Sequence, residues 1–316
     1  MADPSIEQAM ADRLERRPWP AIPLRGDVEV SFELFPPNGP KGTRALAKAA
    51  SRLATLAPAF ISVTYGAGGS TQDRTLSTLG DLASDVEVPL AGHLTCVGAT
   101  EATVHGVLDR YADLGLNRVV ALRGDAPSDG SMAESDFEDA AALVSAIRAR
   151  RDGGSWDISV AGYPEVHPKA SSPASDLEQL KRKVDAGADR VLTQFFLDNE
   201  AFLRLRDAAK RAGVEVPMVP GIMPVGNFER ISSFAGRCGT RIPEWMPQLF
   251  GELEDVPETR QLVAATVAAE QCRHLREHGV GQFHFYTMNT ASLTEATCRM
   301  LGIIPETSDA AMAEVS

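Results

Sequence analysis

The chain has 316 residues, 44% of them hydrophobic, and carries a formal net charge of −12 with a pI near 5.0. This length suits one large α/β barrel, which typically needs about 250 residues. An acidic balance without basic, aromatic-rich stretches argues against a nucleic-acid-binding surface. The cysteines show no paired spacing, which argues against a zinc site or a disulfide framework and fits a reducing cytoplasm. They are Cys96, Cys238, Cys272 and Cys298.

The amino-terminal residues do not predict export. The first fifteen residues include five charged side chains, so they lack the apolar core of a signal peptide and predict a polar helix over 1–20. The longest charge-free run, 53–72, is interrupted by Pro58 and ends in a glycine-rich stretch. That composition suits a strand and loop better than a membrane span. We therefore expect a cytoplasmic protein without a membrane partner, and a flexible tail over 306–316.

Short apolar runs rich in β-forming residues alternate with helix-like segments. The runs are Val28–Phe32, Phe60–Thr64, Leu90–Thr95, Arg118–Leu122, Ile158–Ala161, Val191–Phe195, Met218–Ile222 and Phe283–Tyr286. The helix-like segments include Thr43–Leu56, Glu101–Leu114, Glu134–Arg150, Asp176–Ala186, Glu200–Ala212 and Val256–His278. This alternation indicates parallel strands joined by crossover helices.

Eight such runs favour the α/β class, as a closed (β/α)8 TIM barrel, with a doubly wound sheet as the alternative. We predict a single catalytic domain over 1–316 with its barrel core at about 26–305. The interval before the last strand is about twice as long as the others, which predicts extra helices there.

Glu33 ends the first apolar run, among aromatic residues and just before Pro36 and Pro37. Desolvation by Phe32 and Phe35 would favour the neutral acid and raise the pKa of this carboxyl, as proton donation near neutral pH requires. The alternative is a strand-end glutamate that points into solvent. Glu33 is the leading candidate for a general acid.

Polar residues follow most of the apolar runs. They are Glu33, Thr64-Tyr65-Gly66, His93 and Thr95, Arg123-Gly124-Asp125, Tyr163-Pro164-Glu165-Val166-His167, Gln194 and Asn289. In a barrel of this kind the carboxyl ends of the strands meet at one face, where reactive groups belong. The pattern predicts an active site there without naming its reaction.

Several of these groups suit a phosphate-bearing or flat polar ligand, and each also has a structural interpretation. The glycine run 66–69 could lay backbone N–H groups against a phosphate or form a plain turn. Residues 123–125 put a cation and an anion around a glycine, for ligand approach or for a mutual ion pair. His93 and His167 could bond a cofactor or serve the fold. The basic cluster 181–183 suits phosphate contact or a solvated helix face.

Two classes of chemistry are disfavoured. No nucleophile elbow is present, and no clustered Cys/His arrangement or His-Glu-x-x-His motif offers a metal site. Hydrolase and metalloenzyme functions are therefore not expected, and no metal is predicted.

Eight blocks of the sequence, read in order, resemble methylenetetrahydrofolate reductases. They are 30–37 (VSFELFPP), 62–67 (SVTYGA), 93–96 (HLTC), 121–125 (ALRGD), 163–168 (YPEVHP), 193–196 (TQFF), 220–225 (PGIMPV) and 284–289 (HFYTMN). The similarity spans nearly the whole chain, and its type is the compact bacterial one that has the catalytic domain only.

The resemblance implies reduction of 5,10-methylenetetrahydrofolate to 5-methyltetrahydrofolate by NADH or NADPH through bound FAD, in one-carbon and methionine metabolism. Two substrates would use one site in turn. The folate would be the small-molecule partner, and a homo-oligomer is compatible with the sequence. The resemblance makes Glu33 the general acid that opens the five-membered ring, and it places Asp125 where a negative charge stabilises the cationic iminium.

The resemblance also implies binding residues. Thr64 would contact the nicotinamide, and the flavin would be held by Tyr65, Ala67, His93, Arg123, Gly124, Asp125, Tyr163, His167, Ala170, Asp176, Arg182 and Lys183. The folate would be held by Glu33, Asp125, Gln194, Arg230, Phe234 and Thr290.

The chain departs from the enterobacterial pattern at three places. Ala133-Glu134 stand where a tyrosine–alanine pair is usual, in a shortened loop, so a flavin-edge contact could be missing. Arg230 replaces a glutamine and Thr290 an arginine, so the grip on the folate must differ. Two alternatives stay open: a flavin-free reductase with direct hydride transfer, and a catalytically silent folate- or flavin-binding regulator. No ribose-reading acid distinguishes NADH from NADPH.

Overall fold

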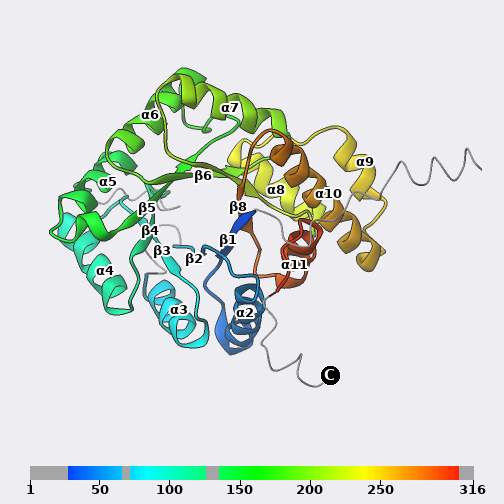
Figure 1. Ribbon diagram of the computed structural model, residues 1–316, viewed down its shortest axis with the longest axis horizontal. Coiled ribbons are helices and arrows are strands. Elements are labelled where there is room, and N and C mark those ends of the chain that lie inside the picture. The colour runs from blue at the N-terminus through cyan, green and yellow to red at the C-terminus, as the bar shows by residue number, and fades with distance from the viewer. Residues whose placement is uncertain (1–27, 66–71, 126–134, 306–316) are drawn as a thin grey trace, which may run out of the picture.

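The computed structural model describes residues 28–65, 72–125 and 135–305. In this part of the chain eight parallel strands close into a barrel in sequence order, and helices surround it (Figure 1). The strands are β1 (Glu29–Leu34), β2 (Phe60–Val63), β3 (Leu90–Thr95), β4 (Arg118–Leu122), β5 (Asp157–Gly162), β6 (Arg190–Phe195), β7 (Met218–Ile222) and β8 (Gln282–Tyr286). Because β1 pairs with β8, the predicted closed barrel is confirmed and the doubly wound sheet is excluded.

The helices follow the alternation that the sequence predicts. They are α2 (Gly39–Ala54), α3 (Gln72–Asp85), α4 (Glu101–Asp113), α5 (Ala140–Ala149), α6 (Pro173–Asp185), α7 (Asn199–Arg211), α8 (Phe228–Cys238), α9 (Trp245–Gly251), α10 (Pro257–Glu277) and α11 (Ala291–Met300), with a 3₁₀ turn, η2 (Gly153–Ser155). Helices α8, α9 and α10 come between β7 and β8 in the sequence and lie on one side of the barrel, which confirms the predicted elaboration before the last strand (Figure 1).

One predicted helix boundary is wrong. The segment predicted as helical from residue 134 becomes helical only at Ala140. Asp139 caps this helix, because its Oδ1 accepts hydrogen bonds from the backbone N–H groups of Ala141 and Ala142 at 2.9 and 3.0 Å. An aspartate at this position satisfies donors that have no partner inside the helix, and so fixes where α5 begins.

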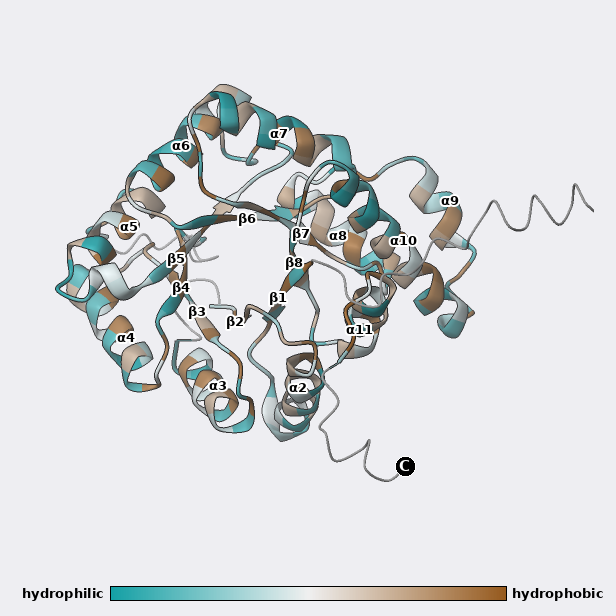
Figure 2. Ribbon diagram, viewed as in Figure 1, coloured by the Kyte–Doolittle hydropathy of each residue, from teal (hydrophilic) through white to brown (hydrophobic). Residues whose placement is uncertain are grey.

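Two apolar layers hold the barrel together. Residues on the outer face of each strand pack against amphipathic helices. Hydrophobic and hydrophilic residues alternate along these helices (Figure 2). The interior is filled by a smaller cluster of Phe60, Ala91, Val120, Leu192 and Val219.

The ring of Phe32 packs toward the helices, beside Phe285 at 6.2 Å between centroids. Successive side chains of a strand face opposite sides of the sheet, so Phe32 and Glu33 face opposite ways. The prediction that Phe32 desolvates this carboxylate is therefore wrong, and the burial of Glu33 comes from the barrel interior.

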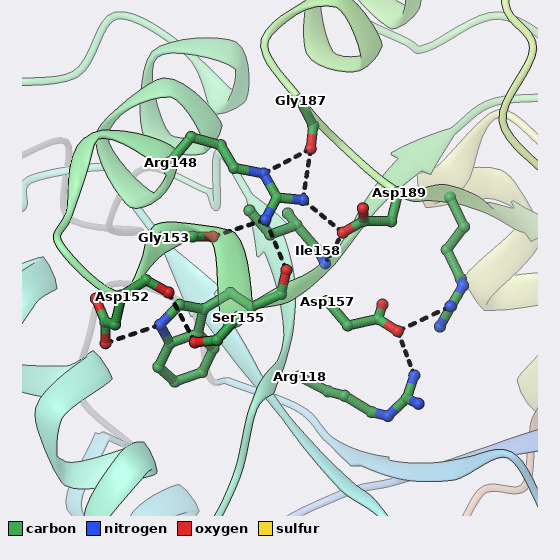
Figure 3. A network of polar contacts seen from close by, with 11 residues as sticks. Arg118, Arg148, Asp152, Gly153, Ser155, Asp157, Ile158, Gly187 and Asp189 are labelled. Carbon is green, nitrogen blue, oxygen red and sulfur yellow. Dashed lines mark hydrogen bonds and ion pairs between the residues drawn. The ribbon is translucent and has the colours of Figure 1, made fainter.

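A polar network lies at the amino-terminal ends of β5 and β6 (Figure 3). Arg148 of α5 donates to the backbone oxygens of Gly187, Gly153 and Trp156 at 2.6–2.9 Å, and pairs with Asp189 at 2.6 Å. One guanidinium thus satisfies three loop carbonyls that would otherwise be left without partners. A neighbouring ion-pair group joins the first residues of three strands, Arg118, Asp157 and Arg190. Charges at this end of a barrel serve stability.

Gly221 of β7 is required by a close approach of two strands. A Cβ atom at this position would lie 2.1 Å from the carbonyl oxygen of Thr193 and 2.5 Å from the ring of Tyr286. The register of β6 against β7 is irregular here, and the Gly221 N–H donates to the Thr193 side chain at 3.0 Å. Such irregularities occur next to active sites, where they redirect strand-end side chains.

Replacing Gly221 with alanine should therefore destabilise the fold by about 3 kcal/mol or more, since neither the carbonyl nor the ring can move away cheaply. Urea unfolding measures this free energy. Gly106→Ala is the control, because a Cβ atom there meets nothing within 4 Å and alanine favours helix α4 by about 1 kcal/mol. An unfolding midpoint for Gly221→Ala equal to that of the unmodified protein would contradict this account.

Among the described residues, no helix combines the length and the hydrophobicity that a bilayer span demands.

Candidate active site

Glu33 lies near the carboxyl end of β1 and is only 7% exposed. Its Oε2 lies 3.4 Å from Nε2 of His93 and 3.9 Å from Nε2 of His284. The alternative of a solvent-pointing glutamate is thus wrong. A buried carboxyl between two imidazoles can hold a proton away from bulk water and release it to a bound substrate.

The imidazole of His93 lies beside Glu33 and does not line the cavity beside β4 and β5 that is described below. This imidazole is 5% exposed on β3. Burial lowers the pKa of His93, while the carboxylate of Glu33 acts in the opposite direction and His284 adds to the lowering. His93 thus favours its neutral form, so that it can face Glu33 without forming an ion pair that would immobilise the proton.

Tyr286 of β8 completes this side of the site. Its hydroxyl donates to the carbonyl oxygen of Thr193 at 2.8 Å. Burial raises the pKa of Tyr286 well above its ordinary value, and the negative charge of Glu33 adds to the effect. The phenol therefore stays protonated and serves as a fixed wall of the site.

Asn289 has a structural position. It adopts a left-handed backbone conformation, with φ of 57°. Its side chain accepts from the Phe35 N–H at 2.8 Å and donates to the Phe35 carbonyl oxygen at 3.0 Å. Asn289 thus binds the segment that leaves β1 to the loop that follows β8, and it holds the end of the strand that carries Glu33.

A cavity of about 460 Å³ opens beside β4 and β5. It gathers most of the predicted flavin-binding residues, although they come from segments about fifty residues apart in the sequence. The predicted residues that line it are Arg123, Gly124, Asp125, Tyr163, His167, Ala170, Asp176 and Lys183. Gly124 has φ of +83°, and a Cβ there would lie 2.9 Å from Thr95 and Val97, so the loop after β4 requires glycine.

Lys183 is one of three cationic side chains that line this cavity, together with Arg123 and Lys169. Its ammonium group donates to the carbonyl oxygen of Ala161. Burial lowers the pKa of Lys183 to about 8, although the carboxylates of Asp176 and Asp139 act in the opposite direction. The ammonium has three N–H donors, so it can bond to the Ala161 oxygen and also to an anionic ligand. The negative charge of such a ligand stabilises the charged form of this buried group.

Asp176 organises the loop that forms the opposite wall. Its Oδ2 accepts from the backbone N–H of His167 at 2.9 Å, and Nδ1 of His167 accepts from the N–H of Lys169 at 3.0 Å. The Tyr163 ring lies edge-on to His167, with 4.5 Å between centroids. Burial lowers the pKa of His167 and raises that of Tyr163 to about 12, so both side chains present neutral donors and acceptors.

The basic cluster 181–183 divides among three environments. Lys181 pairs with Asp185 at 2.7 Å on the helix surface. Arg182 lies 3.0 Å from Asp139 and lines no part of the cavity as it stands. Lys183 alone of the three lines the cavity, because consecutive helical residues point about 100° apart.

Asp125 follows β4 and is the most exposed of the predicted catalytic groups. Its side chain is 83% exposed, with Nζ of Lys169 at 3.9 Å. Arg123 and Asp125 do not pair with each other among the ion pairs of the described residues, so the predicted alternative of a mutual ion pair is not observed. A carboxylate in this position is accessible to a ligand that enters the cavity.

The residues predicted to hold the folate come from three neighbouring parts of the rim. Gln194 is half-buried in β6, and its Oε1 accepts from the Phe195 N–H at 2.9 Å. Phe234 of α8 is half-buried, with the guanidinium groups of Arg237 and Arg230 at 4.5 and 5.8 Å from its ring centre. Thr290 is exposed, directly before α11.

The structure describes only the first two residues of the loop after β2. Thr64 and Tyr65 are half-buried after β2, and burial raises the pKa of Tyr65. Ala67, the glycine run 66–69 and Ala133-Glu134 lie outside the described residues.

A larger cavity, of about 1020 Å³, lies on the flank of the barrel between α7, α9 and α10. It includes none of the predicted site residues, and the charges of its lining are mostly acidic: Asp198, Glu200, Glu244 and Glu270 face Arg241 and His274. The smaller cavity is also lined by four carboxylates, so acidic charge does not separate the two cavities. Its place at the carboxyl ends of β4 and β5, where barrel enzymes have their active sites, makes the smaller cavity the better candidate.

Three residues of the site escape the sequence reasoning. Asp139 lies in the cavity wall. The pattern that could have identified it is a helix-capping aspartate directly before the alanine run 140–142. Ser31 and His284 join Glu33 inside the barrel. Their only signal was the alternation of β1 and β8, which places them on the same strand face as Glu33 and Tyr286.

This geometry defines a (β/α)8-barrel enzyme whose mouth combines a buried carboxyl–imidazole cluster with a cavity suited to an anionic group. The model of the family "Methylenetetrahydrofolate reductase" matches residues 20–302. The chain belongs to this family.

Individual relatives agree. The chain is 44% identical over 282 residues to the 5,10-methylenetetrahydrofolate reductase of Escherichia coli (strain K12), covering 89% of this chain and 93% of that one. It is 42% identical over 283 residues to the enzyme of that name from Pectobacterium carotovorum, covering 90% and 93%.

Among solved structures, an uncharacterized protein from Clostridium thermocellum that binds two copies of 5-methyl-5,6,7,8-tetrahydrofolic acid superimposes with a TM-score of 0.61. The match has 15% identity and covers 88% of this chain and 95% of that one, so it supports the fold alone.

Proposed function

We propose that the protein reduces 5,10-methylenetetrahydrofolate to 5-methyltetrahydrofolate, with NADH or NADPH as the electron donor and FAD as the hydride carrier. The observation that carries this proposal is the placement of Glu33 and Asp125 at one face of a barrel that matches the reductase family over residues 20–302. The similarity of the chain to enzymes of that name over about nine-tenths of its length supports it.

Glu33 acts as the general acid in this proposal. Its carboxyl delivers one proton to the amine nitrogen of the folate's five-membered ring, so that the carbon–nitrogen bond opens and a cationic iminium forms. Burial between His93 and His284 leaves this carboxyl little contact with bulk water. Positioned proton transfer of this kind contributes about 10²–10⁴-fold to a rate.

Asp125 supplies a fixed negative charge where the iminium develops. It lines the cavity from the loop after β4, and it forms a long ion pair with Lys169, at 3.9 Å. Once a ligand displaces water from this loop, the interaction between the carboxylate and the developing cation strengthens.

The residues of the smaller cavity fit FAD. Lys183 and Arg123 can meet its diphosphate, His167 and Tyr163 offer neutral hydrogen-bonding groups, and Gly124 allows close approach of the backbone. A bound FAD would supply hydride transfer between the nicotinamide and the one-carbon unit. Gln194, Phe234, Arg230 and Thr290 would then position the folate, and Thr64 and Phe234 the nicotinamide.

The affinity for FAD should fall as pH rises through about 8. The Lys183 pKa of about 8 means that its ammonium loses charge in this range. The diphosphate binds the charged form and raises its pKa, so binding takes up a proton, and the affinity falls by up to about tenfold per pH unit above 8.

Fluorescence titration of the cofactor-free protein with FAD between pH 7 and pH 9 measures this dependence. Lys183→Met should weaken binding and flatten the profile. Lys181→Met is the matched control, because Lys181 lies on the same helix and pairs with Asp185. A profile in Lys183→Met as steep as in the unmodified protein would exclude Lys183 as the phosphate ligand.

Incubation of the protein with NADH and 5,10-methylenetetrahydrofolate tests the proposed function, with 5-methyltetrahydrofolate measured by mass spectrometry. Product that accumulates in proportion to enzyme supports it. Tight folate binding without turnover would instead favour a silent regulator, and full turnover by a colourless protein would favour direct hydride transfer from the nicotinamide.

A further inference from the structure

A polar seam runs through the barrel interior along β1 and β8. The two strands pair in register, and their inward-facing partners are Glu29 with Gln282, Ser31 with His284, and Glu33 with Tyr286. Beside this seam the interior holds an apolar cluster that includes Phe60 and Val219. Burying polar groups in such a core costs free energy unless they bond to one another, so this arrangement calls for a function.

His284 lies in the middle of the seam and is fully buried. Its Nδ1 lies 2.7 Å from the Ser31 hydroxyl. The ring stacks on Phe60, with 5.8 Å between centroids and 26° between planes, and meets Tyr286 edge-on at 5.3 Å. These contacts from three sides fix the plane of the imidazole.

The other ring nitrogen of His284 faces the catalytic carboxyl. Its Nε2 is buried, has no hydrogen-bond partner and lies 3.9 Å from Oε2 of Glu33. Nε2 of His93 is likewise buried without a partner and lies 3.4 Å from the same oxygen. Two imidazole nitrogens from β3 and β8 therefore converge on one of the two oxygens of Glu33.

We propose that Ser31 and His284 position Glu33, so that its transferable proton resides on Oε1. This inference rests on the proposed acid role of Glu33. The Ser31 hydroxyl donates to Nδ1, which leaves the hydrogen on Nε2, and a small side-chain adjustment lets Nε2 donate to Oε2. Oε2 accepts this bond both in the neutral acid and in the carboxylate. Oε1 is then the oxygen that loses a proton to the folate and regains one from solvent after each turnover.

The groups that face Glu33 support this assignment. They are His93 from β3, His284 and Tyr286 from β8, and the hydroxyl of Ser62 from β2, which is the register partner of Glu33. Burial favours the neutral form of His93 and of Tyr286. The set contains no lysine or arginine, so orientation of the proton falls to hydrogen bonds from these neighbouring side chains.

The test compares Ser31→Thr with Ser31→Val. The two replacements have nearly the same shape, and only threonine keeps the hydroxyl. Ser31→Val should lower kcat for folate reduction about tenfold with little change in KM, since a misplaced acid slows the chemical step. It should also shift the alkaline limb of the pH–rate profile to higher pH, because a carboxylate that loses a donated hydrogen bond is protonated more readily. Ser31→Thr should resemble the unmodified enzyme.

A second readout does not depend on turnover. The ¹⁵N chemical shifts of His284 in the cofactor-free protein report which ring nitrogen carries hydrogen. Hydrogen on Nε2 is expected in the unmodified protein and in Ser31→Thr, and a mixture of the two tautomers in Ser31→Val. If the valine variant fails to fold, Ser31→Ala takes its place.

Ser159→Ala is the control, since Ser159 is a buried serine of β5 that faces the same interior and is 3% exposed. It should leave both readouts unchanged. Equal pH profiles and tautomers for Ser31→Thr and Ser31→Val would overturn the proposal. If Glu33→Gln retained full folate reduction, the acid role itself would fail; loss of activity in Glu33→Gln with normal Ser31→Val would remove only the positioning role.

Discussion

Replacing Glu33 with glutamine should lower the rate of folate reduction by about 10²–10⁴-fold and leave oxidation of NAD(P)H through the flavin largely intact. Glutamine keeps the size and polarity of the side chain but holds no acidic proton. Only the step that opens the folate ring requires that proton. The change therefore separates the two half-reactions.

Stopped-flow measurement of each half-reaction gives this result directly. Glu29→Gln is the matched control, because Glu29 lies on the same strand face as Glu33, and its Oε1 accepts from Gln282 at the exposed amino-terminal end of β1. The control should retain both rates. Survival of both half-reactions in Glu33→Gln would remove Glu33 from the chemistry.

Asp125→Asn should lower the rate of folate reduction by about 10²–10³-fold, the range seen when one electrostatic group is removed from an active site. Because the Asp125 side chain is 83% exposed and its ion pair with Lys169 is long, at 3.9 Å, the fold should be unaffected. The KM for folate should change less than kcat, since the carboxylate acts on a charge that develops only as the iminium forms.

Lys169→Met separates this role from a structural one. Lys169 is the cation nearest to Asp125 among the ion pairs of the described residues, at 3.9 Å. If Asp125 served chiefly to hold the loop through that pair, both changes would reduce activity equally. We expect Lys169→Met to retain most of the rate, and an Asp125→Asn variant as active as the unmodified protein would contradict the electrostatic role.

The fold was predictable because its signals are local. Eight runs of apolar residues recur with helical segments between them, and each run is short enough to read without knowledge of its neighbours. Helices α3 and α11 are exceptions. The buried face of α3 includes Thr75 and Thr78, and that of α11 includes Thr294, Glu295 and Thr297. Polar residues on the inner face hide the apolar periodicity that marks the other helices.

The candidate site was predictable in part. Glu33 carried its signal in its own segment, an acid at the end of an apolar strand. The pair of Ser31 and His284 did not, because its members are 253 residues apart and meet only through the register of β1 against β8. Lys183 differs from Lys181 only by the direction in which α6 turns each side chain, which three consecutive basic letters do not reveal.

The measurement that tests the central claim most directly is the absorption spectrum of the purified protein under anaerobic conditions, recorded after addition of NADH and again after addition of 5,10-methylenetetrahydrofolate. We expect flavin bands that bleach with NADH and return with the folate, with one molecule of 5-methyltetrahydrofolate formed for each flavin that is reoxidised. A protein that shows no flavin bands, or bands that stay bleached when the folate is added, would contradict it.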